Sequence, residues 1–273
     1  MEPGIGEMIA MNIKLTKRKC SNPQQVNTCY RLRPTNGYTL DELKNGYLWF
    51  SLRSGFKDVN DANVGAFIKD TPQILRGLEL IYTEEGVKEF VRLMDNTGIC
   101  CFTKSFPKKE TLFHFPNGKR SLCLEYDRQK LEDYFVNSKY AIAAPFKDIV
   151  YCKHPTKMKT NGDYHILTYK DKNGCMYESV YTLFGDPKKI DYLLHLLLTR
   201  LDVKFRNQNE SRIIIGGRNQ KYLKDGDNGY KIEIPMEAIS QVYLYKKPTD
   251  AFLKELYNIP HMKNKIKILY KQK

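Results

Sequence analysis

The chain of 273 residues has no long apolar run, and none approaches the roughly 18 residues that a membrane-spanning helix needs. The stretch from Met8 to Ile13 is too short and too interrupted by polar residues to be a signal peptide. We therefore expect a cytoplasmic protein that has no membrane partner.

Paired cysteines are missing as well. The seven cysteines are an odd number without a C-x-x-C pair, so they form no secreted-type disulfide framework, and we expect reduced thiols. Cys152 and His154 would share one face of a strand, but two further ligands at zinc spacing are lacking. Asp58 and Asp61 have a loop spacing that is more typical of turn hydrogen bonds than of metal ligands. The sequence thus predicts no metal site.

Acidic residues are few relative to basic ones, with 31 Asp and Glu against 45 Lys and Arg, which gives a formal net charge of +14. Such a charge raises the local concentration of anions such as nucleic acids, nucleotides and acidic proteins. Eight lysines lie between Lys246 and Lys273, where only Asp250 and Glu255 oppose them. This segment is either a solvated basic helix and tail or a binding surface, and the pattern leaves both interpretations open.

The residues that are present suffice for a globular core, because hydrophobic residues make up 41% of the chain and include thirteen Phe and nineteen Tyr. We expect residues 1–26 to be a loose basic arm. Residues 27–273 should form a single α+β domain with a basic C-terminal helix and tail, since no linker or internal repeat interrupts them. The core should be a mixed or antiparallel sheet flanked by helices.

Apolar runs bounded by turn residues predict the strands, and apolar positions at helical spacing behind N-cap residues predict the helices. The predicted strands are 29–33, 47–51, 99–103, 121–126, 148–152, 164–169, 175–184, 230–234 and 241–245. The predicted helices are 39–45, 71–81, 83–97, 127–135, 187–201 and one that begins near Thr249. Thr39 and Glu42 are expected to form a capping box at the start of the first helix. Asn173-Gly174 predicts a hairpin between two of the strands.

The most informative stretch runs from Lys204 to Gly217 and reads KFRNQNESRIIIGG. Its β-branched run, closed by two glycines, predicts a buried strand. On an extended backbone, Gln208, Glu210 and Arg212 would share one face at the mouth of that strand. Because a lone buried carboxylate is costly, Glu210 must meet water, a cation such as Arg212, or a ligand.

This stretch and four earlier blocks together resemble an uncharacterised bacterial family, domain-of-unknown-function family 2971. The shared order is an aromatic after a lysine, then Glu/Gln-x-Glu-x-Arg and an apolar strand, preceded by the blocks Leu48 to Ser51, Phe56 to Asp61, Cys101 to Thr103 and Cys123 to Asp127. The chain departs from the family pattern at Lys57 and Val59, which replace Asn and Pro, and at Gln208, where Glu is commoner. The Trp-rich block before Cys123 is reduced to Leu112-Phe113-His114-Phe115.

The layout of these strands is also similar to that of ADP-ribosyltransferases. In that superfamily the second acidic residue binds the ribose of NAD and stabilises the positive charge that develops as nicotinamide leaves. The resemblance implies an ADP-ribosyltransferase-like fold, with NAD as substrate, no metal, and a nucleic acid or protein as acceptor. The implied catalytic residues are Glu210, Gln208 and Ser51, and the implied NAD-binding residues are Tyr30, Arg31 and Arg212.

Two alternatives to this interpretation stay open. Glu210 and Arg212 can form a purely structural ion pair, with Ser51 simply ending a strand. The whole chain can also be a non-catalytic nucleic-acid-binding module, in which aromatic residues stack on bases among the C-terminal lysines. The aromatics concerned are Tyr243, Tyr245, Tyr257 and Tyr270.

Overall fold

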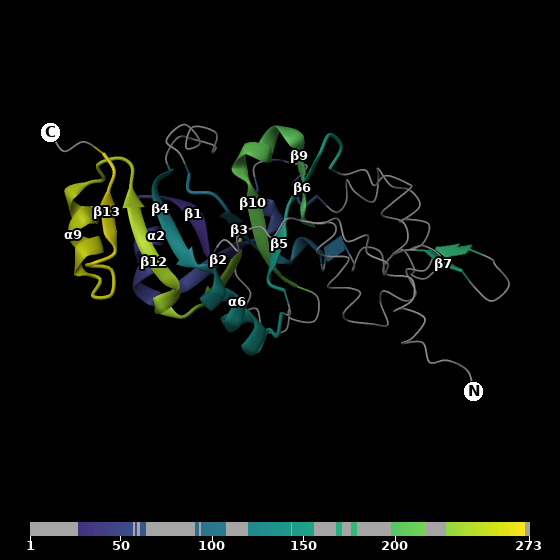
Figure 1. Ribbon diagram of the computed structural model, residues 1–273, viewed down its shortest axis with the longest axis horizontal. Coiled ribbons are helices and arrows are strands. Elements are labelled where there is room, and N and C mark those ends of the chain that lie inside the picture. The colour runs from purple at the N-terminus through teal and green to yellow at the C-terminus, as the bar shows by residue number, and fades with distance from the viewer. Residues whose placement is uncertain are drawn as a thin grey trace.

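The computed structural model describes residues 27–56, 58, 61–63, 91–92, 94–107, 120–142, 144–155, 168–170, 176–178, 198–216 and 228–270. These residues form a mixed α+β fold whose largest part is a nine-stranded, mostly antiparallel sheet (Figure 1). Within the described ranges, no helix is both long and apolar enough to cross a membrane.

The large sheet has the strand order β11-β2-β3-β1-β4-β12-β13, and β10 and β5 extend it from β3. Its strands are β1 (Thr28–Pro34), β2 (Tyr47–Ser51), β3 (Gly98–Thr103), β4 (Arg120–Asp127), β5 (Phe146–Asp148), β10 (Glu210–Ile215), β11 (Gly229–Glu233), β12 (Ile239–Leu244) and β13 (Ile266–Ile268). Two smaller sheets pair β6 (Val150–Cys152) with β9 (Arg200–Asp202), and β7 (Thr168–Lys170) with β8 (Met176–Glu178).

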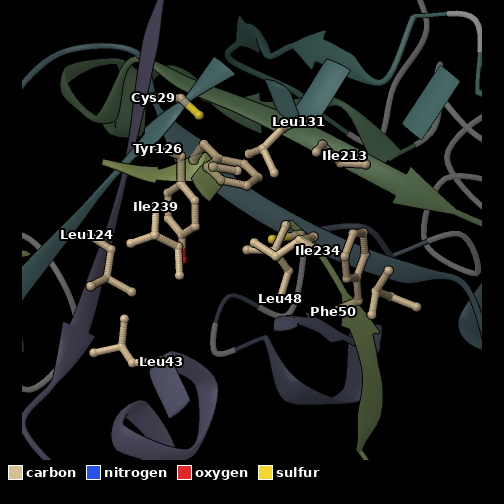
Figure 2. Close-up of a cluster of buried hydrophobic side chains, with 14 of the residues drawn as sticks. Cys29, Leu43, Leu48, Phe50, Leu124, Tyr126, Leu131, Ile213, Ile234 and Ile239 are labelled. Atoms are coloured by element: carbon tan, nitrogen blue, oxygen red, sulfur yellow. The ribbon is translucent and has the colours of Figure 1, made fainter. Parts of the chain in front are cut away.

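Three α-helices that are described over their whole length accompany the sheet. They are α2 (Gly37–Asn45), α6 (Arg128–Asn137) and α9 (Asp250–Asn258), and the short 3-10 turns are η1 (Arg53–Gly55), η4 (Val203–Gln208) and η6 (Met236–Ala238). The apolar sides of the three helices pack on one face of the sheet, which we call the helix-covered face. Figure 2 shows Leu43 of α2 and Leu131 of α6 in the same buried cluster as Leu48, Phe50 and Tyr126 from the strands.

Strand pairing fixes which side chains lie on each face, since directly paired residues share a face and neighbours along a strand alternate. On β3, Cys100 and Phe102 belong to the core under the helices, so Cys101 and Thr103 lie on the opposite face. Thr103 pairs with Tyr30 on one side and with Glu210 on the other. The opposite face therefore carries Glu210 and is the one that matters for the predicted site.

The predicted strands over 29–33, 47–51, 99–103, 121–126, 230–234 and 241–245 are confirmed to within two residues at their ends, as is the helix predicted over 127–135. Thr249 is confirmed as the N-cap of the last helix, because its side chain accepts a hydrogen bond from the backbone N–H of Phe252. Strands β7 and β8 pair as the hairpin interpretation of Asn173-Gly174 requires. Local sequence chemistry thus determined most of these boundaries.

Other expectations were wrong. Asn36, rather than Thr39, caps α2, and Glu42 faces the interior instead of closing a capping box. The strand predicted over 148–152 is two short strands, β5 and β6, which pair with different partners. The predicted helix 187–201 ends before Arg200, where β9 begins, and β13 lies within the segment expected to be a helix and tail.

Several expectations lie outside the described residues. These are the basic arm 1–26, the helix 71–81, most of the helix 83–97, the helix 187–197, Gly217, and much of the strands 164–169 and 175–184.

Candidate active site around Glu210

Strand β10 positions the candidate site. All six of its side chains are buried, and it pairs along its length with β3 and through Ser211, Arg212 and Ile213 with β5. The β-branched run Ile213 to Ile215 suits a strand that is packed on both faces. Glu210 and Arg212 are thereby held on a strand that has a hydrogen-bonded neighbour on each side.

Arg212 is the hub of a buried ion cluster that we call the Arg212 cluster, made of Arg212, Glu210 and Asp61. The Arg212 side chain is fully buried, and its Nε donates to Oε1 of Glu210 at 2.6 Å. Nη1 and Nη2 donate to the two carboxylate oxygens of Asp61, each at 2.8 Å, and Nη1 also donates to the carbonyl of Leu198 at 2.8 Å. This bidentate geometry is the strong form of a guanidinium–carboxylate interaction.

The Arg212 cluster contains two carboxyl groups for one guanidinium, so it carries one surplus negative charge when both are ionised. Burial raises the pKa of Asp61 above its usual 3.8, although the guanidinium of Arg212 opposes this shift. Burial and the carboxylate of Glu210 together raise the pKa of the Cys101 thiol well above its usual range. The site is therefore one in which additional positive charge is electrostatically favoured.

Aromatic residues and backbone groups complete the surroundings of Glu210. The Tyr151 hydroxyl accepts a hydrogen bond of 2.7 Å from the Glu210 backbone N–H, and burial raises the pKa of Tyr151 to about 12. The ring of Phe56 lies 5.6 Å from the guanidinium carbon of Arg212. The Glu210 side chain itself is only 10% exposed, so the carboxylate is held nearly dry and in one orientation.

The predicted partners of Glu210 do not all gather around it. Gln208 is not on the strand: it ends η4, and Asn209 adopts a left-handed backbone with φ of 43°, so extended alternation begins only at Glu210. Ser51 shares the face of Glu210 but pairs with Ile99. Ile99 lies four residues before Thr103, or roughly 13 Å along β3. Ser51 is therefore too far along the strand to brace the carboxylate.

Tyr30 and Arg31 lie on different faces of the sheet. Tyr30 is on the Glu210 face, separated from Glu210 by Thr103, and its hydroxyl lies 3.1 Å from that of Thr28. Arg31 is on the helix-covered face, where it stands opposite Leu124 of the core, so Arg31 and Glu210 do not line one NAD site as the resemblance implies. Arg212 also differs from the expectation, because four of its N–H groups are already used within the protein.

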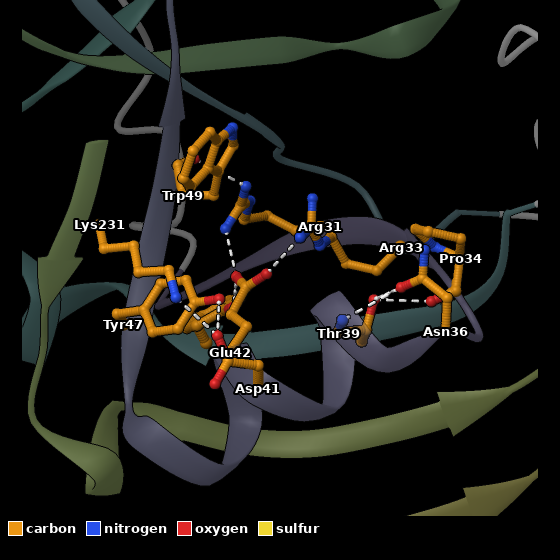
Figure 3. A network of polar contacts seen from close by, with 11 residues as sticks. Arg31, Arg33, Pro34, Asn36, Thr39, Asp41, Glu42, Tyr47, Trp49 and Lys231 are labelled. Atoms are coloured by element: carbon orange, nitrogen blue, oxygen red, sulfur yellow. Dashed lines mark hydrogen bonds and ion pairs between the residues drawn. The ribbon is translucent and has the colours of Figure 1, made fainter. Parts of the chain in front are cut away.

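Arg31 belongs instead to a second buried network around Glu42 (Figure 3). Nη1 of Arg31 donates to Oε1 of Glu42 at 2.6 Å, and Nη2 of Arg33 lies 2.7 Å from Oε2 of the same carboxylate. Arg31 also donates to the carbonyl of Trp49, and the Tyr126 hydroxyl donates to Glu42. This network fastens α2 to the sheet.

Sequence reasoning missed Asp61 and Glu42 as the partners of the buried arginines. Asp61 is 151 residues away from Arg212, and nothing local links the two. A usable signal existed for Glu42, because it precedes the buried Leu43 on the apolar side of a short helix. A carboxylate at such a position needs a buried cation.

Comparison of the chain with protein-family models, with curated proteins and with solved structures finds no match. The resemblances described above therefore rest on their motifs alone. Among the described residues, no group of three or more His, Cys, Asp or Glu side chains could hold a metal ion.

Proposed function

We propose that the chain is an NAD-dependent enzyme of the ADP-ribosyltransferase type, in which Glu210 is the catalytic carboxylate. The observation that supports this proposal is the fixed and largely buried Glu210 carboxylate, which shares the single guanidinium of Arg212 with a second carboxyl group, that of Asp61. A carboxylate oriented in advance stabilises a developing cation without having to reorganise. The fold proposed with it is the ADP-ribosyltransferase-like one, on a nucleic acid or protein acceptor.

The proposed reaction breaks the bond between C1′ of the ribose and the nicotinamide nitrogen, and the electron pair leaves with nicotinamide. Glu210 stabilises the positive charge that this leaves on the ribose ring. An acceptor nucleophile then forms a bond to C1′ and loses its proton. If water replaces the acceptor, the same step hydrolyses NAD.

Only part of the predicted NAD site fits this proposal. Arg31 and Arg212 were expected to hold the dinucleotide, but both are committed to buried carboxylates. Neither can bind a diphosphate without breaking those pairs. The diphosphate must therefore be bound by other residues, and the proposal concerns the Glu210 end of the site.

The test is nicotinamide release from NAD by the wild type and by Glu210→Gln. The substitution keeps size and hydrogen bonding but removes the charge, so most turnover should be lost, by about 100-fold or more. Folding should be retained, because Asp61 and Leu198 still hold Arg212. Glu233→Gln, at an exposed position of β11, is the matched control and should leave turnover unchanged.

Two results would remove the enzymatic proposal. One is a wild type that neither binds NAD in calorimetry nor releases nicotinamide with any acceptor. The other is a Glu210→Gln variant that turns over as fast as Glu233→Gln. In either case Glu210 is a structural partner of Arg212.

A second function, nucleic-acid binding without catalysis, is favoured by the formal charge of +14. Lys246, Lys247, Lys254, Lys263 and Lys267 are all exposed, whereas Lys265 is half-buried and donates to the carbonyl of Ile239. The tyrosines expected to stack on bases differ in solvent exposure. Tyr257 is 42% exposed, but Tyr245 is buried and donates to the carbonyl of Pro107.

A further inference from the structure

A cluster of aromatic rings stands on the sheet face opposite the helices. Phe106, just after β3, packs its ring against Tyr30 at 5.5 Å, Tyr243 at 4.8 Å and Tyr245 at 6.1 Å between centroids. Phe106 is 40% exposed, and Tyr30 and Tyr243 are half-buried. We call these four residues the Phe106 cluster: Phe106, Tyr30 and Tyr243 present ring surface to solvent, and Tyr245 is buried beside them.

The position of the Phe106 cluster follows from strand pairing. Tyr30 pairs with Glu125 and Tyr243 pairs with Cys123, across the neighbouring strands β1, β4 and β12. Leu32, Cys123 and Tyr245 form a small apolar cluster on this face, separate from the main core. Strands β1 and β12 thus hold Tyr30 and Tyr243 side by side beneath Phe106, so the partly exposed rings form one contiguous aromatic surface.

Positive charge lies at the edge of the Phe106 cluster. Lys267 of β13 pairs in register with Tyr243, and its Nζ is 5.6 Å from the centre of the Tyr243 ring. Lys246 is exposed directly after Tyr245. The whole chain carries a formal charge of +14, so a polyanion is the partner that this surface complements.

We propose that the Phe106 cluster binds single-stranded nucleic acid. Aromatic rings on a sheet stack with unpaired bases, and neighbouring lysines bind the phosphates between them. Duplex bases are stacked on one another and cannot reach the rings, so the preference is for single strands. The binding itself needs no catalysis.

The surface also bears on the acceptor of the proposed enzyme. Thr103 separates Tyr30 from Glu210 in one row of the sheet, which places Glu210 about 10 Å from Tyr30 on the same face. A strand bound to the Phe106 cluster would therefore lie near the carboxylate. This step alone rests on the proposed function and makes nucleic acid the acceptor class.

The experiment measures fluorescence anisotropy of a labelled oligothymidylate at low and moderate salt. Phe106→Ala should weaken binding about fivefold or more, since stacking on one ring contributes about 1 to 3 kcal/mol per base. Tyr38→Ala is the matched control: Tyr38 is 77% exposed on α2, so its removal should leave binding unchanged. A duplex of the same length should bind more weakly than the single strand.

Two further variants keep the proposal testable if Phe106→Ala does not fold. Phe106→Leu fills most of the space without a ring face and should weaken binding, whereas Phe106→Trp should retain it.

A separate variant tests the charge of this face. Glu125 is a carboxylate on this face that accepts a hydrogen bond from the Tyr243 hydroxyl at 2.8 Å. Glu125→Gln should tighten binding at low salt, because it removes repulsion of phosphate.

The proposal fails if the wild type does not bind oligothymidylate at low salt. It also fails if Phe106→Ala and Phe106→Leu match Tyr38→Ala, which would indicate binding by diffuse charge alone. If Phe106→Ala changes only the oligomeric state in light scattering, the surface contacts a second copy instead. Oligothymidylate binding in a protein without any NAD turnover would contradict the enzymatic proposal but support this one.

Discussion

Removing the guanidinium of Arg212 tests whether the Arg212 cluster is a genuine buried ion cluster. Arg212→Ala leaves the carboxylates of Glu210 and Asp61 and the carbonyl of Leu198 without their shared donor. Arg212 is fully buried, and each of the two carboxylate side chains is 10% exposed. Water can therefore replace the lost contacts only in part.

The expected loss of unfolding free energy at neutral pH is about 3 to 5 kcal/mol, the usual cost of leaving a buried charge unpaired. The free energy of protonating an unpaired carboxyl group gives a similar figure. Protonating one carboxyl group of ordinary pKa near 4 at pH 7 costs about 4 kcal/mol, at about 1.4 kcal/mol for each pKa unit. Such a loss is a large part of the margin of about 5 to 15 kcal/mol that a domain has.

The assay is urea unfolding of Arg212→Ala at several pH values between neutral and about pH 5. Lowering the pH reduces the free energy needed to protonate a carboxyl group that has lost its partner. The loss of unfolding free energy should therefore shrink by about 2 to 3 kcal/mol over that range. Arg206→Ala removes an exposed arginine from η4 and is the control, with an expected effect within about 0.5 kcal/mol. Arg212→Lys should fall between the two, because it keeps the charge but loses the planar fork.

An unfolding free energy that Arg212→Ala lowers no more than Arg206→Ala does would contradict a buried ion cluster. A large loss that does not depend on pH would contradict it as well. In that case the loss would come from packing rather than from unpaired carboxylates.

Two more predictions concern the buried charges. Glu42→Gln should lower the unfolding free energy by about 3 to 5 kcal/mol, because Arg31 and Arg33 lose their shared carboxylate. Glu132→Gln, which removes only a surface pair, should cost less than about 1 kcal/mol, and equal costs in thermal melting would contradict the network. The pKa of Asp61 is raised on folding, so its contribution to stability is full below pH 3.8 and is lost as pH rises through the raised pKa. Asp61→Asn should therefore lose stability less steeply than the wild type between about pH 4 and neutral, and an unchanged slope in urea titrations would show that Asp61 does not titrate as described.

The sequence by itself determined the features that depend on neighbouring residues. The β-branched run Ile213 to Ile215 had to be a buried strand, and Thr249 had to cap a helix, because strand and cap chemistry act over a few residues. The net charge and the α+β class also follow directly from composition and pattern. The Glu210–Arg212 ion pair was open to prediction for the same reason, since the two residues are one strand period apart.

Only the tertiary structure decided which distant groups meet. Asp61 reaches Arg212 across 151 residues, and no periodicity along the chain reports such a contact. Arg31 lies on the helix-covered face because it stands opposite Leu124 of the core in the pairing of β1 with β4, and the sequence of β1 does not contain that pairing. The left-handed Asn209 likewise removed Gln208 from the strand, and a single such residue resets the alternation on which the predicted site relied.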